Sequence, residues 1–150
     1  MRVRFILPAI MMASVEMVEA QTSVEYIGGT APQLAAGTQG SIVLADDRYL
    51  AFYAGKTQLR VAYDRIDLVE YGQQVDRRLA LAVVLSPVFL LSRSRKHFLT
   101  IGYSGEDGKQ QAMMFRVDKN SIRPTLAGLE ARTGLKVQYQ DEQARKARNQ

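Results

Sequence analysis

Two stretches of this chain alternate apolar and polar side chains with a period of two, and no other feature restricts the fold as strongly. Between residues 41 and 63 short runs follow this alternation, separated by the turn sequences Asp46-Asp47-Arg48 and Gly55-Lys56. Because successive side chains of a strand point to opposite faces, the runs predict antiparallel strands with one buried face. These strands are expected at residues 41–44, 49–53 and 58–63. The core-facing set is expected to be Ile42, Leu44, Leu50, Phe52, Leu59 and Val61, and the opposite set Tyr49, Tyr53, Gln58 and Arg60.

The second alternating stretch, residues 97–117, predicts a hairpin, because two strand-like runs flank a polar turn that contains glycine. Leu99, Ile101 and Tyr103 are expected to face Met113, Phe115 and Val117 on its buried side. A further strand fits residues 66–71, and a last short one fits residues 135–139.

From Asn120 the apolar spacing becomes that of a helix, with Ile122, Leu126 and Leu129 on one face. Asn120 or Ser121 suits the N-cap, Pro124 is expected in the first turn, and Gly134 suits the end of the helix. The sequence therefore predicts an α+β protein. Its expected architecture is a curved antiparallel sheet or partly open barrel of about six to seven strands with one C-terminal amphipathic helix.

An uncharged, strongly apolar run occupies residues 79–92 in the middle of the chain. If its large side chains stayed in water, the lost free energy of burial would be about 14–27 kcal/mol. A whole domain is typically stabilised by only about 5–15 kcal/mol. Even when partial collapse of the unfolded chain halves the first figure, the run cannot be a solvated loop. Its borders are basic and consist of Arg77, Arg78, Arg93, Arg95 and Lys96.

Three interpretations of this run remain open from the sequence. It can be core that covers an open end of the barrel, with Pro87 bending it. It can dip into a membrane interface while its basic borders meet anionic head groups, or it can be a contact surface for a protein partner or a second copy. A full crossing is disfavoured, because fourteen helical residues span only about 21 Å of a hydrocarbon core of about 30 Å. The expected membrane- or partner-binding residues are Leu85, Val88, Phe89, Leu90, Arg77, Arg78, Arg93, Arg95 and Lys96.

The first twenty residues have the pattern of a secretory signal peptide, with basic residues, an apolar stretch over 5–15 and a small-residue cleavage signal at Ala20. We therefore expect an exported protein, periplasmic or extracellular. Glu16 and Glu19 are unusual near such a site, so an uncleaved N-terminal anchor is the alternative. The expected organisation is a signal peptide at 1–20, an irregular lead-in at 21–39, one domain at 40–140 with the apolar insertion 79–92, and a charged, disordered tail at 141–150.

Composition argues against several kinds of chemistry. The chain has no cysteine and one histidine, so neither a disulfide nor a thiolate or multi-histidine metal site can form within it. The sequence predicts no cofactor, no metal and no catalytic residue. Carboxylate pairs at Asp46-Asp47 and at Glu106-Asp107 fall on expected turns. A hydrolase is kept as an alternative only if Asp46, Asp47, Glu70 or Glu106 converge in a cleft.

The net charge is +5, which favours anionic partners without choosing among them. Arg93, Arg95, Lys96 and His97 beside Phe98 form a basic-aromatic cluster that lacks the pattern of an RNA-binding motif. Nucleic acid is therefore not an expected partner. The expected partners are an anionic lipid surface or another envelope protein, and a homo-oligomer is compatible with the sequence.

The succession of short strands closed by one C-terminal helix resembles the pleckstrin-homology-like fold, above all its GRAM and bacterial variants. Two segments also resemble small exported bacterial proteins that carry such a domain: residues 96–115, with Lys96-His97-Phe98-Leu99-Thr100-Ile101, Tyr103, Asp107-Gly108-Lys109 and Phe115, and residues 123–137, with Arg123, Thr125-Leu126, Leu129-Glu130-Ala131-Arg132-Thr133-Gly134 and Lys136-Val137.

The resemblance implies a binding or scaffolding domain and no enzymatic activity. It does not imply a particular head-group site, because the first expected hairpin turn, Asp46-Asp47-Arg48, is acidic on balance and the chain has no tryptophan. Lys56 and Arg60 lie around the second hairpin instead. The expected function is peripheral association with the cell envelope through residues 79–92 and their basic borders. The alternative is a protein-interaction or self-association module that uses the same surface, or an open sheet edge.

Overall fold

The computed structural model of the chain describes residues 21–73, 84–85 and 96–140, with side chains for the first and last of these ranges. The expected signal peptide, the C-terminal tail and most of the apolar run lie outside the described residues.

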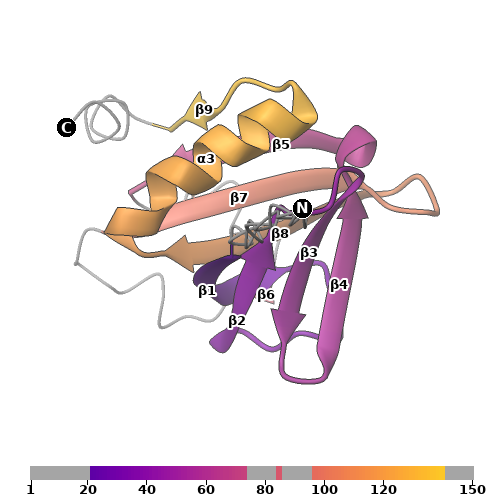
Figure 1. Cartoon of the computed structure of the whole chain (residues 1–150). Helices are drawn as coiled ribbons and strands as arrows, with labels where there is room; N and C mark the ends of the chain where they lie inside the picture. Colours follow the sequence, from indigo (N-terminus) through magenta and orange to yellow (C-terminus); the bar gives the residue numbers. More distant parts are fainter. Residues whose placement is uncertain (1–20, 74–83, 86–95, 141–150) are drawn as a thin grey trace, which may run out of the picture.

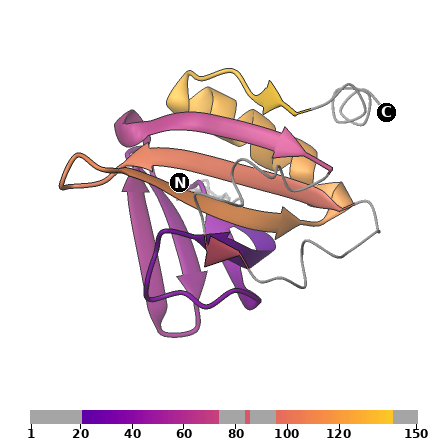
Figure 2. The same ribbon diagram turned by 180° about the vertical axis from the view of Figure 1, so that it is seen from behind.

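The described residues form one open, mixed sheet with a single α-helix and a short 3₁₀ helix, η1 Tyr63–Arg65, which is an α+β fold (Figures 1 and 2). The strands are β1 Gln21–Gly29, β2 Thr38–Val43, β3 Tyr49–Ala54, β4 Thr57–Ala62, β5 Ile66–Gly72, β6 Val84–Leu85, β7 His97–Ser104, β8 Gln110–Val117 and β9 Gln138–Tyr139. Their order is β4-β3-β2-β1-β8-β7-β5-β9, with β6 paired to β1 beside this path. Neighbours are antiparallel except β5 and β9, which are parallel.

The strands expected from alternation are confirmed as β2, β3, β4, β5, β7 and β8. Most of the expected core side chains are buried, while Leu59 is half-buried and packs against the core. Tyr49 and Tyr53 are exposed on the other face, as expected. In the hairpin β7–β8 the register pairs Leu99 with Phe115 and Ile101 with Met113. Alternation, together with the polar turn between β7 and β8, was therefore a sufficient signal for these elements.

The expected irregular lead-in is wrong over residues 21–29, because β1 is a long strand in the middle of the sheet; residues 30–37 are irregular as expected. Strand β1 pairs with β2 along one edge and with β8 along the other. Residues 24–28 are all buried, so this strand shows no alternation of apolar and polar side chains. A Cβ on Gly29 would lie 2.4 Å from the Ala112 carbonyl oxygen. The glycines here therefore reflect close packing of strands and not a loop.

The α-helix of the described residues, α3 (Lys119–Thr133), begins earlier than expected. Its N-cap is Asp118, whose side chain accepts a hydrogen bond from the Asn120 amide at 2.8 Å. Pro124 consequently lies beyond the first turn. The expected C-terminal end is confirmed at Gly134, which has a left-handed backbone with φ of 73°. β9 then lies beside β5.

The core lies between the inner face of the sheet and α3, which passes in front of β5 and the end of β7 in Figure 1. At its centre the rings of Tyr26, Phe52 and Phe115 are in mutual contact, with centroids 5.1–6.3 Å apart. Ile27, Phe98 and Met114 are also buried but do not belong to this core cluster. Since Phe98 and Met114 alternate with core residues, they face the opposite side of the sheet. The sheet is therefore covered on both faces near β1, β8 and β7.

Candidate functional site

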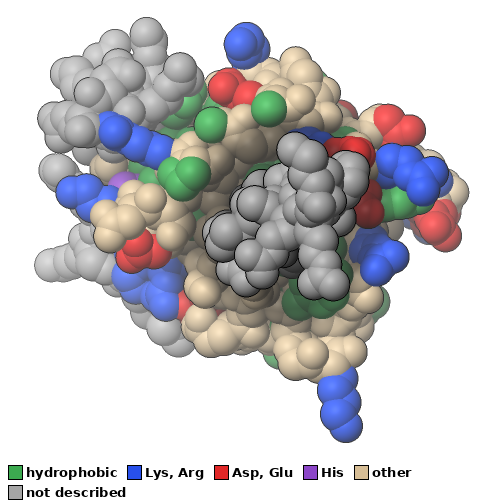
Figure 3. All heavy atoms as spheres, viewed as in Figure 1, with side chains coloured by type: hydrophobic (Ala, Val, Ile, Leu, Met, Phe, Trp, Pro, Cys, Tyr) green, Lys and Arg blue, Asp and Glu red, His purple; other side chains and the backbone are tan. Residues whose placement is uncertain are grey.

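A groove of about 400 Å³ opens where β1, β8 and β7 lie side by side, next to the start of α3. It is lined by residues of β1, β2, β7, β8 and α3 and by the residues just before β7 and α3. These are Ser23, Val24, Glu25, Gln39, Lys96, His97, Arg116, Val117, Asp118 and Lys119. The sheet order produces it, because His97 and Val24 both pair with Val117, one from each side of β8. Figure 3 shows Lys and Arg side chains gathered near the protein's one histidine at the left edge of this view. We call this feature the basic groove.

One cation of the basic groove is neutralised by a fixed partner. Arg116 on β8 and Glu25 on β1 are opposite each other in register, and their side chains form an ion pair. The Glu25 side chain is only 11% exposed and that of Arg116 is 34% exposed. One nitrogen of the Arg116 guanidinium therefore compensates a nearly buried carboxylate.

The other two cations have no such partner among the described residues. Lys119 is exposed at the first position of α3, and Lys96 is half-buried just before β7. Among residues 21–73 and 96–140, neither ammonium forms an ion pair. The carboxylate of Asp118 caps the helix through the Asn120 amide. Two lysines therefore face a groove in which the acidic groups already have partners.

His97 adds a titratable group to the basic groove. Its Nδ1 lies 2.5 Å from the hydroxyl oxygen of Tyr71 on β5, and the two rings are nearly parallel. Burial lowers the pKa of His97 below its usual value, and the positive charge of Lys119 lowers it further, whereas Asp118 acts in the opposite direction. His97 is thus held towards its neutral form by its surroundings. A negative charge in the groove would favour protonation.

Of the binding residues expected from the sequence, Lys96 is the one whose side chain is described, and it lines the basic groove. Leu85 is described by its backbone, which pairs with Gly28 in β1 (Figure 2). The remaining expected residues, Arg77, Arg78, Val88, Phe89, Leu90, Arg93 and Arg95, lie outside the described residues. The groove also contains Arg116, Lys119 and Glu25, which sequence reasoning missed. The one available signal was the polar Arg116 within the apolar end of β8.

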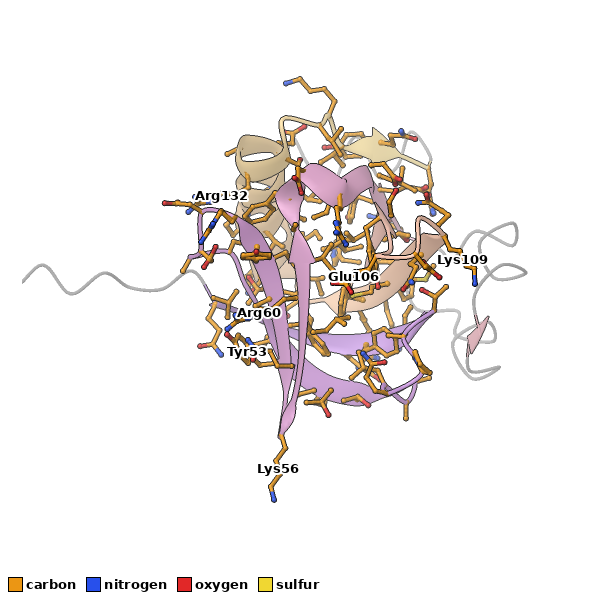
Figure 4. The ribbon with its side chains drawn as sticks, turned by 90° about the vertical axis from the view of Figure 1, so that its right-hand side faces the viewer. Tyr53, Lys56, Arg60, Glu106, Lys109 and Arg132 are labelled. Carbon is orange, nitrogen blue, oxygen red and sulfur yellow. The ribbon has the colours of Figure 1, made fainter. Side chains whose placement is uncertain are left out.

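The carboxylates considered for hydrolysis do not share a cleft. Asp46 accepts hydrogen bonds from the amides of Arg48 and Tyr49 in its own turn, and Asp47 pairs with Arg132 of α3. Glu70 lies on β5 and accepts a hydrogen bond from Gln140. Glu106 is exposed in the β7–β8 turn, away from Arg132 in Figure 4. The structure therefore does not bring this set together.

A second surface carries exposed aromatic and cationic side chains on β3 and β4. Tyr49 and Tyr53 are 36% and 40% exposed, and Arg60 on β4 is opposite Ala51, midway between them. Figure 4 shows Tyr53 and Arg60 together on the outer side of these strands, with Lys56 at the tip of their turn. β4 ends the described sheet and has one neighbour, β3. We call this feature the tyrosine face.

Comparison with known proteins gives no relative: no family model and no curated protein matches the chain. Within the described ranges, no three His, Asp or Glu side chains come together as a metal site would require. None of the helical structure in this part of the chain has the length and apolar character of a membrane-crossing helix.

Proposed function

We propose that this chain is an exported, non-enzymatic binding domain of pleckstrin-homology-like architecture. In this proposal it associates peripherally with the cell envelope through residues 79–92 and their basic borders. The observation that carries the proposal is the basic groove. Lys96 belongs to the expected basic border and stands with Lys119 and Arg116 around one cavity. Cations from separate parts of the chain thus converge at the place where the apolar run returns to the sheet.

The architecture supports the pleckstrin-homology-like part of the proposal. β1 to β4 follow one another in order, β1 also pairs with β8, and one helix follows the last long strand. This is the succession of short strands and a C-terminal helix on which the resemblance was based. Domains of this kind hold head groups, peptides or proteins, so the proposed fold supports a binding role by analogy.

The test is flotation of the purified protein with vesicles that contain phosphatidylglycerol. Five border cations contribute about 5 kcal/mol at about 1 kcal/mol each, and insertion of apolar side chains is needed for stable attachment. We expect the protein to float, and we expect added salt to reduce the floating fraction. Replacing Leu85, Phe89 and Leu90 by Ser is expected to abolish flotation.

The matched control replaces Tyr49 and Tyr53 by Ser, which removes exposed apolar side chains from the tyrosine face. This control is expected to float like the original protein. Circular dichroism checks that each variant keeps its strands. If the triple variant loses the fold, residues 79–92 are core. A wild-type protein that does not float with the vesicles contradicts envelope association.

The tyrosine face favours a second candidate, a protein-interaction or self-association module. Tyrosine and arginine are enriched among the residues that dominate binding energy at interfaces, and an open strand edge can accept another strand. Sedimentation at increasing concentration without lipid is expected to reveal self-association. Tyr53→Ser with Arg60→Ser is expected to remove it, whereas a monomer at high concentration contradicts it.

A further inference from the structure

We propose that the basic groove is a binding site for the phosphate group of an anionic ligand, and that His97 takes up a proton when this group binds. This ligand assignment rests on the proposed function, since it names the chemistry that the same surface recognises. The two can nevertheless be tested apart, because the groove can be probed without any membrane.

The charges of the described residues favour an anion in the groove. Lys96, Arg116 and Lys119 carry positive charge, against Glu25 and Asp118. Arg116 and Glu25 form a pair, and Asp118 accepts the Asn120 amide. The two lysine ammonium groups are therefore left as the charges available to a ligand. They come from different elements, so an anion between them interacts with both.

The types of donor favour phosphate over carboxylate. Bidentate recognition of a carboxylate typically uses an arginine fork, and here one nitrogen of that fork already contacts the Glu25 carboxylate. Lysine binds phosphate as a point charge with three donors. Ser23 and Gln39 add a hydroxyl and an amide to the groove lining. A tetrahedral group with several acceptor oxygens can use donors that approach from different sides.

The surroundings of His97 couple its protonation to occupancy of the groove. Tyr71 on β5 contacts its Nδ1, while Asp118 and Lys119 face it from the start of α3. Lys96 precedes it, and the pair of Arg116 and Glu25 lies across β8 and β1. Burial and Lys119 keep the pKa of the imidazole low. A phosphate in the groove partly cancels the field of Lys119, so it raises that pKa.

His97 is the protein's one histidine, so an untagged sample gives a single imidazole signal whose titration is read by NMR. We expect inorganic phosphate to raise the midpoint of this titration in a saturable manner, by about 0.5 pH unit or more relative to sodium chloride of equal ionic strength. By linkage, a shift of 0.5 means that phosphate binds about threefold more tightly to the protonated protein. Sodium sulfate serves as a second anionic probe, because sulfate, unlike phosphate, does not itself titrate in the pH range where histidine does.

The test variant carries Lys96→Gln and Lys119→Gln, and the matched control carries Lys56→Gln and Lys109→Gln. Both remove two positive charges, but Lys56 and Lys109 lie at turns outside the groove (Figure 4). The phosphate-induced shift is expected to be lost in the first variant and kept in the control. Equal loss in both, or a midpoint that phosphate does not move, overturns the site.

Vesicles then distinguish the source of the phosphate and separate this proposal from the envelope proposal. If the Lys96→Gln, Lys119→Gln variant loses flotation with phosphatidic acid vesicles, the phosphate belongs to a lipid head group. If this variant floats unchanged while phosphate no longer shifts its His97 titration, the groove takes a soluble phosphate compound. A phosphate shift in a protein that never floats supports the groove and overturns envelope association. Flotation with no phosphate shift overturns the groove proposal alone.

Discussion

His97 is a half-buried imidazole whose protonation is opposed from two sides. Burial removes water that would solvate the imidazolium, and Lys119 repels it. The pKa in the folded protein is therefore lower than the usual value near 6.5 that applies to an unfolded chain. Between these two values the unfolded state binds more protons. Acidification through this window must consequently favour unfolding.

We predict that His97→Gln removes part of the pH dependence of stability. In the wild type, the His97 contribution to the free energy of unfolding is complete above the unfolded pKa. It falls as the pH drops through the unfolded pKa, and it levels off below the lowered pKa of the folded state. Urea unfolding at a series of pH values measures this slope, which should be shallower in the variant. Identical slopes would show that His97 titrates alike in both states.

Among the strands, those that alternate or that flank a clear hairpin turn were predictable, including β7, which is buried over residues 98–103, whereas β1 was not. β2, β3 and β4 alternate, so their core residues could be assigned from the sequence. β1 is buried on both faces over residues 24–28 and looks like an irregular segment. The basic groove was out of reach for a related reason. Lys96 and His97 stood out as a cluster. The β7–β8 hairpin brings Arg116 beside them, but Glu25 joins them only through the β1–β8 pairing.

Helix α3 provides a prediction at the scale of an element. Asp118→Ala removes the acceptor of the Asn120 amide and should lower the free energy of unfolding by about 0.5–2 kcal/mol. Asp118→Asn keeps a side-chain acceptor at the N-cap and should be close to wild type. It also removes one negative charge from the basic groove, so we expect tighter phosphate binding. Urea unfolding and phosphate titration of both variants check this, and equal stability of the two would contradict the cap.

Across the whole molecule, the sheet changes direction between β2–β4 and β5, β7 and β8 (Figure 1). Only β1 is paired with both parts. Tyr26 on β1, Phe52 on β3 and Phe115 on β8 meet where these parts join. Every ring of this trio is buried. The two parts of the sheet therefore share one core, and the walls of the basic groove depend on that core for their relative position.

This shared core predicts a single unfolding transition for the described domain. Phe115→Ala should lower the free energy of unfolding by about 3–5 kcal/mol, and Phe115→Leu should lower it by less because more of the volume is retained. Far-ultraviolet circular dichroism reports on the strands, while tyrosine fluorescence reports on both parts of the sheet, which carry Tyr53 and Tyr103 respectively. The two signals should change together in each protein, since the trio couples the parts. Two separate transitions, with only one displaced by Phe115→Ala, would mean that the sheet consists of two units that fold independently.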